Sequence, residues 1–106
     1  MVLVHTVTLV ALDSTTEDEL RAASDALMAL AASIAAVKSV RFGATFTTDR
    51  ARGYTHQLVV ELETKDDLAV YATHPAHVAV INDHLKGAFD LSKTLAMDFE
   101  SLTNCD

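Results

Sequence analysis

Four segments of the chain have the pattern of β-strands. They are rich in β-branched and aromatic residues, which strands favour. Apolar side chains recur at every second position in each of them, so each predicted strand has a mainly apolar face. The predicted strands span residues 2–12, 37–46, 54–63 and 91–100.

Two other segments have helical spacing, with apolar residues every three or four positions. The first helix is predicted over residues 16–36, where it opens with a capping-box pattern, and the second over residues 64–87. Pro75, the only proline, interrupts the second helix. Proline disfavours helical backbone in the residue before it but suits the first position of a helix. We therefore predict that the helix breaks at His74 and restarts at Pro75.

The order β-α-β-β-α-β predicts a single α+β domain over residues 1–106, of the ferredoxin-like type. In that fold a four-stranded antiparallel sheet carries both helices on one face, and its other face has no cover from the same chain. The first strand is apolar on both faces, with Val2, Val4, Val10 and Leu12 on the second one. Because monomers rarely expose an apolar patch of that size, we expect a homodimer.

Composition narrows the choice of partners and compartment. The 106 residues carry a formal net charge of −7, which argues against nucleic acid or an anionic membrane surface as the partner. The only cysteine, Cys105, permits no internal disulfide and no cysteine-based metal site. The apolar start of the chain lacks a basic segment, a cleavage-like site and the length of a membrane span. We expect a cytoplasmic protein.

Titratable rings gather around the proline break. Tyr71, at the end of one helical segment, and His77, in the first turn of the next, are expected to point into one crevice. Strand periodicity places His5 and His56 on the strand faces that meet the helices. We therefore expect these four rings to share a dry pocket. The alternative is a kinked surface helix that happens to carry histidines, with His5 as a core histidine whose hydrogen bonds are satisfied.

Such a group of rings suits acid/base chemistry. Aldol-type closure of a poly-β-keto chain needs a base for an activated C–H proton and an acid for the developing alkoxide. Imidazole titrates near pH ~6.5 and burial favours its neutral form, so His77 is the candidate base. Tyr71, with an ordinary pKa of ~10, is the candidate donor. Asp98 is the candidate orienter of His77, or alternatively an exposed residue at the end of a strand.

Other chemistries have less support in the sequence. His74 and His77 lie across a proline break rather than at the spacing of two helical zinc ligands, and no carboxylate completes a metal site. There is no glycine-rich phosphate loop and no serine elbow. We expect no cofactor and no metal, and we interpret His84 as incidental.

Taken together, these residues resemble a known family. The matching stretches are Gly53-Tyr-Thr-His56, then Tyr71-x-x-His74-Pro-x-His77-Val, then Met97-Asp-Phe99, together with His5. They are similar to the stress-responsive A/B barrel domain family of dimeric α/β barrels, over nearly the whole chain. The resemblance implies a homodimer whose two sheets close a barrel. By comparison with the polyketide cyclases of that family, it also implies that His77 and Tyr71 are the base and acid and that His5 and His56 line the pocket.

Three functions follow from the pattern and the resemblance. The first is a cofactor-free cyclase or lyase acting on a polyketide-like or other small carbonyl substrate, with His74 and Asp98 as further substrate contacts. The second is a non-enzymatic, stress-associated structural protein. The third is a cofactor-independent oxygenase, as in neighbouring families of the same barrel. The set of convergent rings favours the first.

Overall fold

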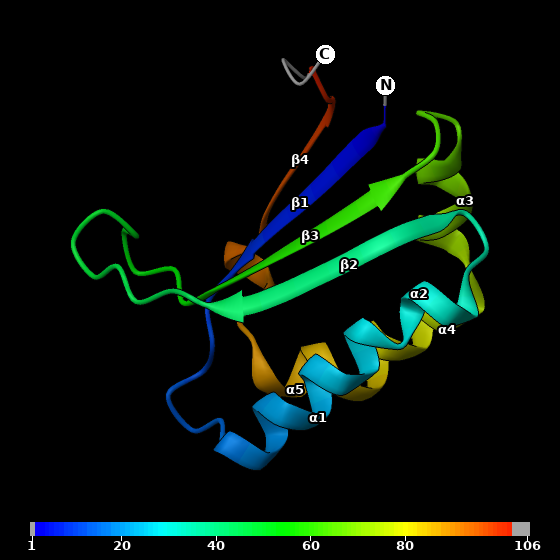
Figure 1. Ribbon diagram of the computed structural model, residues 1–106. Helices are drawn as coiled ribbons and strands as arrows, with labels where there is room; N and C mark the ends of the chain where they lie inside the picture. The colour runs from blue at the N-terminus through cyan, green and yellow to red at the C-terminus, as the bar shows by residue number, and fades with distance from the viewer. Residues whose placement is uncertain (1, 103–106) are drawn as a thin grey trace.

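The computed structural model describes residues 2–102 and confirms the predicted ferredoxin-like α+β fold; Cys105 lies outside the described residues. One antiparallel sheet has the strand order β2-β3-β1-β4. The strands are β1 (Leu3–Leu9), β2 (Val37–Ala44), β3 (His56–Leu62) and β4 (Leu95–Glu100). All the helices lie on one side of this sheet (Figure 1).

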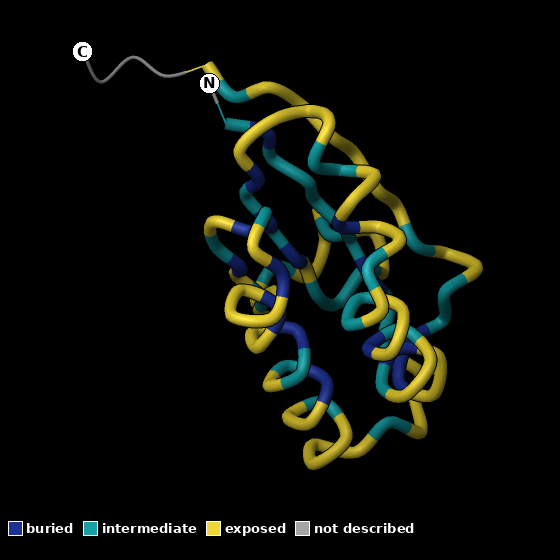
Figure 2. Tube along the Cα trace, turned by 90° about the vertical axis from the view of Figure 1, so that its right-hand side faces the viewer, coloured by how far each residue is buried: buried dark blue, intermediate teal, exposed yellow. Residues whose placement is uncertain are grey.

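The helical layer has two parts, one after β1 and one after β3. The first consists of α1 (Glu17–Met28) and the short α2 (Leu30–Ser33). The second consists of α3 (Asp67–Thr73), α4 (Pro75–Val80), the π-helical turn η1 (Ile81–Leu85) and α5 (Lys86–Ala88). A 3-10 turn, η2 (Leu91–Lys93), precedes β4. Buried residues lie on the sides where helices and sheet face each other, and the outer sides of the helices are exposed (Figure 2).

Local hydrogen bonds explain where these helices begin. The predicted capping box is present: the Glu19 N–H donates to the Thr16 hydroxyl oxygen, and the Thr16 N–H donates to the Glu19 carboxylate. The start of α3 has a different arrangement. Thr64 donates its N–H and hydroxyl to the Asp67 carboxylate, but Asp66 is the N-cap residue and its side chain makes no cap bond.

Several predicted ends are wrong. The first helical segment stops at Ser33, before Ala36, and the second extends past Gly87 to Ala88. The predicted second strand stops at Ala44, which leaves Phe46 98% exposed in the following loop. The last strand begins at Leu95 rather than Leu91, because the Asp90 carboxylate accepts the Ser92 N–H and caps a helical turn there.

Strand register decides which side chains meet the helices. In β1, Leu3 and Leu9 are buried against the helical layer, and His5 and Val7 lie between them on the same face. The opposite face of the sheet carries exposed apolar side chains on the edge strand β4: Leu95, Met97 and Phe99 are 54%, 71% and 50% exposed. The described residues therefore leave an apolar sheet face without cover.

Candidate active site

The proline break has the predicted geometry. α3 ends at Thr73, and His74 has extended backbone angles (φ −63°, ψ 135°). Pro75 is the first residue of α4. The His74 Nδ1 accepts a hydrogen bond from the Ala76 N–H at 3.0 Å, so this imidazole caps α4. His74 does not line the cavity described below, and the capping bond accounts for its presence.

The break brings three rings together. The ring centroids of Tyr71 and His77 lie 4.4 Å apart, and those of Tyr71 and His5 lie 5.6 Å apart. Tyr71 is 1% exposed, so its ring packs beneath the two imidazoles rather than lining the cavity itself. Sequence reasoning thus identified three of the residues that meet at this point.

The hydrogen bonding of His77 favours one tautomer. Its Nδ1 lies 3.0 Å from the carbonyl oxygen of Ala72, an acceptor, so in the neutral ring Nδ1 carries the proton and Nε2 keeps its lone pair. Burial lowers the pKa of His77; its bond to Ala72 raises that pKa, and the charge of His5 lowers it further. The net shift is downward, so the ring is mostly neutral at pH 7 and Nε2 can accept a proton.

Asp98 is paired with His5, and the expectation that it orients His77 is wrong. β1 and β4 place His5 directly opposite Asp98, and the His5 Nδ1 lies 2.5 Å from the Asp98 carboxylate. The carboxylate accepts, so His5 Nδ1 carries a proton. The ring of His5 is thereby held in one orientation, as in other carboxylate-histidine pairs. The two imidazoles are thus held by different partners: His77 by the Ala72 carbonyl and His5 by the Asp98 carboxylate.

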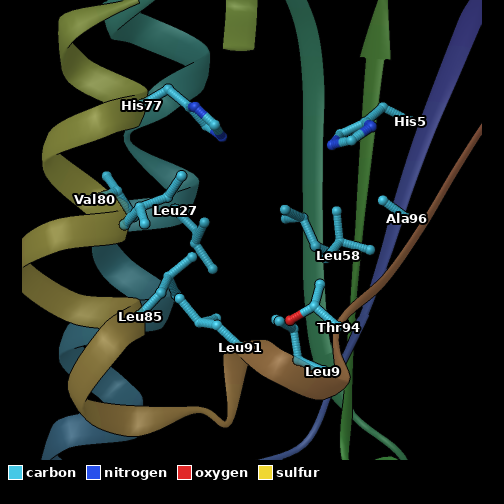
Figure 3. Close-up of a pocket in the computed structure, with 12 residues that line it drawn as sticks. His5, Leu9, Leu27, Leu58, His77, Val80, Leu85, Leu91, Thr94 and Ala96 are labelled. Atoms are coloured by element: carbon cyan, nitrogen blue, oxygen red, sulfur yellow. The ribbon is translucent and has the colours of Figure 1, made fainter. Parts of the chain in front are cut away.

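A cavity of about 290 Å³ lies between the sheet and the helices. His77 from α4 and His5 from β1 point toward each other across one end of it, and Thr94 lies with Leu9 and Leu91 at the other end (Figure 3). The remaining lining side chains are apolar: Val7, Leu27, Leu58, Val80, Ile81, Leu85 and Ala96. The volume is near the lower end of the ~300–1,000 Å³ typical of small-molecule sites.

Two hydroxyls near this cavity lack partners. In the described part of the chain, the hydroxyl oxygens of Tyr71 and Thr94 are the buried side-chain polar atoms without a hydrogen bond. Leaving such a group unpaired costs about 1–3 kcal/mol each. Burial raises the pKa of Tyr71 to about 12, so its hydroxyl keeps its proton across the physiological range and is available as a hydrogen-bond donor.

His56 lies elsewhere, which corrects the expectation of four rings in one pocket. Its imidazole stacks on Phe42, with centroids 5.5 Å apart, and meets the edge of Phe89. In the register of β1 and β3, His5 pairs with Val60, four residues from His56. At ~3.3 Å per residue this is a separation of about 13 Å along the strand. Burial lowers the pKa of His56, in keeping with an aromatic environment.

Of the residues that line the cavity, the sequence analysis named only His5 and His77 as site candidates, and Thr94 was missed. Leu27, on the apolar stripe of α1, forms part of the cavity wall. Thr94 is a polar residue at the start of an apolar strand, and this is the only sequence feature that singles it out. His84 lines a separate surface hollow with Glu19 and Asp83.

Residues 2–102 contain neither a membrane-spanning helix nor a cluster of metal-binding side chains. No helix among them is long and apolar enough to cross a bilayer. No three or more of their His, Cys, Asp and Glu side chains are grouped in a way that could hold a metal ion.

Comparison with known proteins agrees with this architecture. A protein from Arabidopsis thaliana is 24% identical, with a TM-score of 0.85 over 96% of this chain and 97% of the other. A dimeric ferredoxin-like protein of unknown function from Thermobifida fusca is 26% identical, with a TM-score of 0.77 over 93% and 90%. The hydroxynitrile lyase of Passiflora edulis is 14% identical, with a TM-score of 0.81 over 92% and 91%. A search of curated proteins finds no match.

The family comparison covers nearly all of the chain. The profile of the stress responsive A/B barrel domain matches residues 3–101, which include every strand and helix described above. The chain therefore belongs to the stress-responsive A/B barrel domain family.

Proposed function

We propose that this protein is a cofactor-free acid/base enzyme that acts on a small carbonyl compound, with aldol-type ring closure of a polyketide-like chain as the reaction. The observation that carries the proposal is the placement of His77 and His5 at one end of an otherwise apolar cavity, with the Tyr71 ring packed against both imidazoles. An apolar cavity with convergent polar groups is what a small-molecule site requires. Lyase chemistry on a related carbonyl compound needs the same groups.

The reaction begins with proton removal. Nε2 of His77 takes a proton from the carbon between two carbonyl groups, and the electron pair of that C–H bond moves to give an enolate. The Tyr71 hydroxyl, which has no other partner, donates a hydrogen bond to the enolate oxygen. The enolate carbon then attacks a second carbonyl of the same chain, which forms the new C–C bond. The resulting alkoxide receives the proton held by His77.

His5 and Asp98 assist at the same end of the cavity. The Asp98 carboxylate fixes the His5 ring, so that the other ring nitrogen faces the cavity. With the proton on Nδ1, that nitrogen can accept a hydrogen bond from a hydroxyl or enol group of the substrate. The electrostatic effect of His5 also lowers the pKa of His77, which favours the neutral form of the proposed base.

Proton removal from a diketone tests this function without knowledge of the natural substrate. We expect the protein to accelerate exchange of the central C–H of a 1,3-diketone with D₂O, measured by NMR against buffer alone. Because the pKa of His77 is lowered, the catalysed rate should fall only as the pH drops below ~6.5. Because the pKa of Tyr71 is about 12, its hydroxyl should stay protonated, and the rate should not fall as the pH rises to about 10.

An absence of catalysed exchange with any member of a panel of diketones and β-keto esters would contradict the proposal. The stress-associated structural role would then be the better explanation of the fold. Catalysed uptake of oxygen by the same substrates would instead favour the oxygenase alternative.

We also propose that the protein is a homodimer that pairs through the uncovered face of the sheet. Leu95, Met97 and Phe99 are exposed there, and relatives from Thermobifida fusca and Bacteroides fragilis are described as dimeric. Met97→Glu should give monomers at micromolar concentration in sedimentation velocity, because a charge cannot be buried unpaired in an apolar interface. Met28→Glu, on the exposed side of α1, is the matched control and should remain dimeric. A wild-type protein that sediments as a monomer would contradict the proposal.

A further inference from the structure

Polar side chains occupy both ends of the cavity, and only one end belongs to the proposed chemistry. His5 and His77 lie at the first end, and Thr94 is the one polar lining residue at the other. The antiparallel register pairs Thr8 of β1 with Leu95 of β4, so Thr94 lies beside Leu9. Leu9 is four residues from His5 along β1. At ~3.3 Å per residue the two ends lie about 13 Å apart.

The Thr94 hydroxyl differs from other threonine hydroxyls of the protein. Thr6, Thr15 and Thr73 each donate to a backbone carbonyl, at 3.1, 2.7 and 2.8 Å. The Thr94 hydroxyl is buried and has no partner among the described residues. Its oxygen points from the sheet toward the helices, next to apolar lining residues (Figure 3).

Packing gives no reason for a hydroxyl at this position. The turn before β4 is already closed by the backbone, where the Thr94 N–H donates to the Leu91 carbonyl at 3.3 Å. Valine would fill the same space, favours strands equally and would leave no unpaired oxygen.

We propose that Thr94 forms a distal subsite that binds a hydroxyl or carbonyl oxygen at the far end of the substrate. The ligand is then an elongated molecule with oxygen at both ends and an apolar middle, which Leu58, Val80 and Leu85 contact. The inference rests on the proposed function in placing the reacting carbonyl at the histidine end. The subsite determines which substrate binds and takes no part in the proton transfers.

A matched pair of ligands tests the subsite by binding alone. The two probes are linear 1,3-diketones of equal length, one ending in a methyl group and the other in a hydroxyl, and the dissociation constant is measured by NMR titration. Thr94→Val should weaken binding of the hydroxyl-ended probe by about 3- to 10-fold, which is the net worth of one hydrogen bond. It should leave the methyl-ended probe unchanged or bound more tightly. Thr94→Ser, which keeps the oxygen, should retain the preference of the wild type.

Thermal unfolding shows whether the valine variant folds. Its Tm should rise by a few degrees, because an unpaired buried hydroxyl is replaced by a methyl group.

If Thr94→Val weakens binding of both probes equally, or of neither, the subsite is overturned while the proposed function stands. If the preference is found but no central C–H exchange is catalysed, the proposed function fails and the subsite stands. If neither probe binds to the wild type, both are overturned.

Discussion

His77→Ala is expected to slow the catalysed exchange of the diketone proton by on the order of 10²–10⁴-fold, the usual contribution of a general base. Its Nε2 lone pair is available at pH 7, because burial lowers the pKa of the ring and Nδ1 is hydrogen-bonded to the Ala72 carbonyl. His77 is a partly exposed first-turn residue, so the free energy of unfolding should change by no more than about 1 kcal/mol. Rates by NMR and unfolding by urea titration check the two parts.

His84→Ala is the matched control for this loss. His84 lies one helical segment further on, in the π-helical turn, and lines a hollow away from the cavity. We expect the exchange rate and the free energy of unfolding of the His84→Ala variant to equal those of the wild type. Full activity in the His77 variant, or its failure to fold, would remove His77 as the base and leave its ring with a structural role.

Tyr71→Phe should make the protein less active and more stable at once. The ring remains in contact with both imidazoles, and only a hydroxyl without a partner is lost. Loss of the donor to the enolate oxygen should reduce the rate by on the order of 10²-fold or more. Relief of the unpaired buried hydroxyl should raise the free energy of unfolding by about 1 kcal/mol. The two effects are measured on the same preparation by NMR exchange and urea titration.

Tyr54→Phe is the control for this variant, and its expected effects on stability and activity are the opposite. The Tyr54 hydroxyl donates to the Lys93 carbonyl at 2.8 Å, so its removal should lower stability and leave the catalysed exchange unchanged. If Tyr71→Phe also lowered stability, its hydroxyl would have a partner in the folded protein. It would then not be held for a ligand.

The strongest local rules of the sequence predicted most of the fold and part of the site. A single proline fixed the break at His74 and the start of the next helix, and this placed His77 beside Tyr71. Strand periodicity assigned His5 to the helix-facing side of the sheet, where it lines the cavity. These features depend on the backbone preferences of one or two residues, which can be read directly from the sequence.

The predictions that failed concern where a residue lies along its strand, and not the face of the sheet on which its side chain lies. Periodicity puts His56 on the correct face, but only strand register shows that it lies four residues from the partner of His5. The same register pairs Asp98 with His5 instead of His77. Thr94 was missed because β4 begins later than its apolar pattern indicates, after a turn capped by Asp90.

The most direct test of the account is a crystal structure of the protein with a bound, non-cyclising 1,3-diketone. We predict that the diketone binds in the cavity between sheet and helices. One of its oxygens should lie within ~3 Å of the Tyr71 hydroxyl, and its central carbon should face Nε2 of His77. A diketone bound only outside this cavity, or one whose oxygens meet neither Tyr71 nor His5, would contradict it.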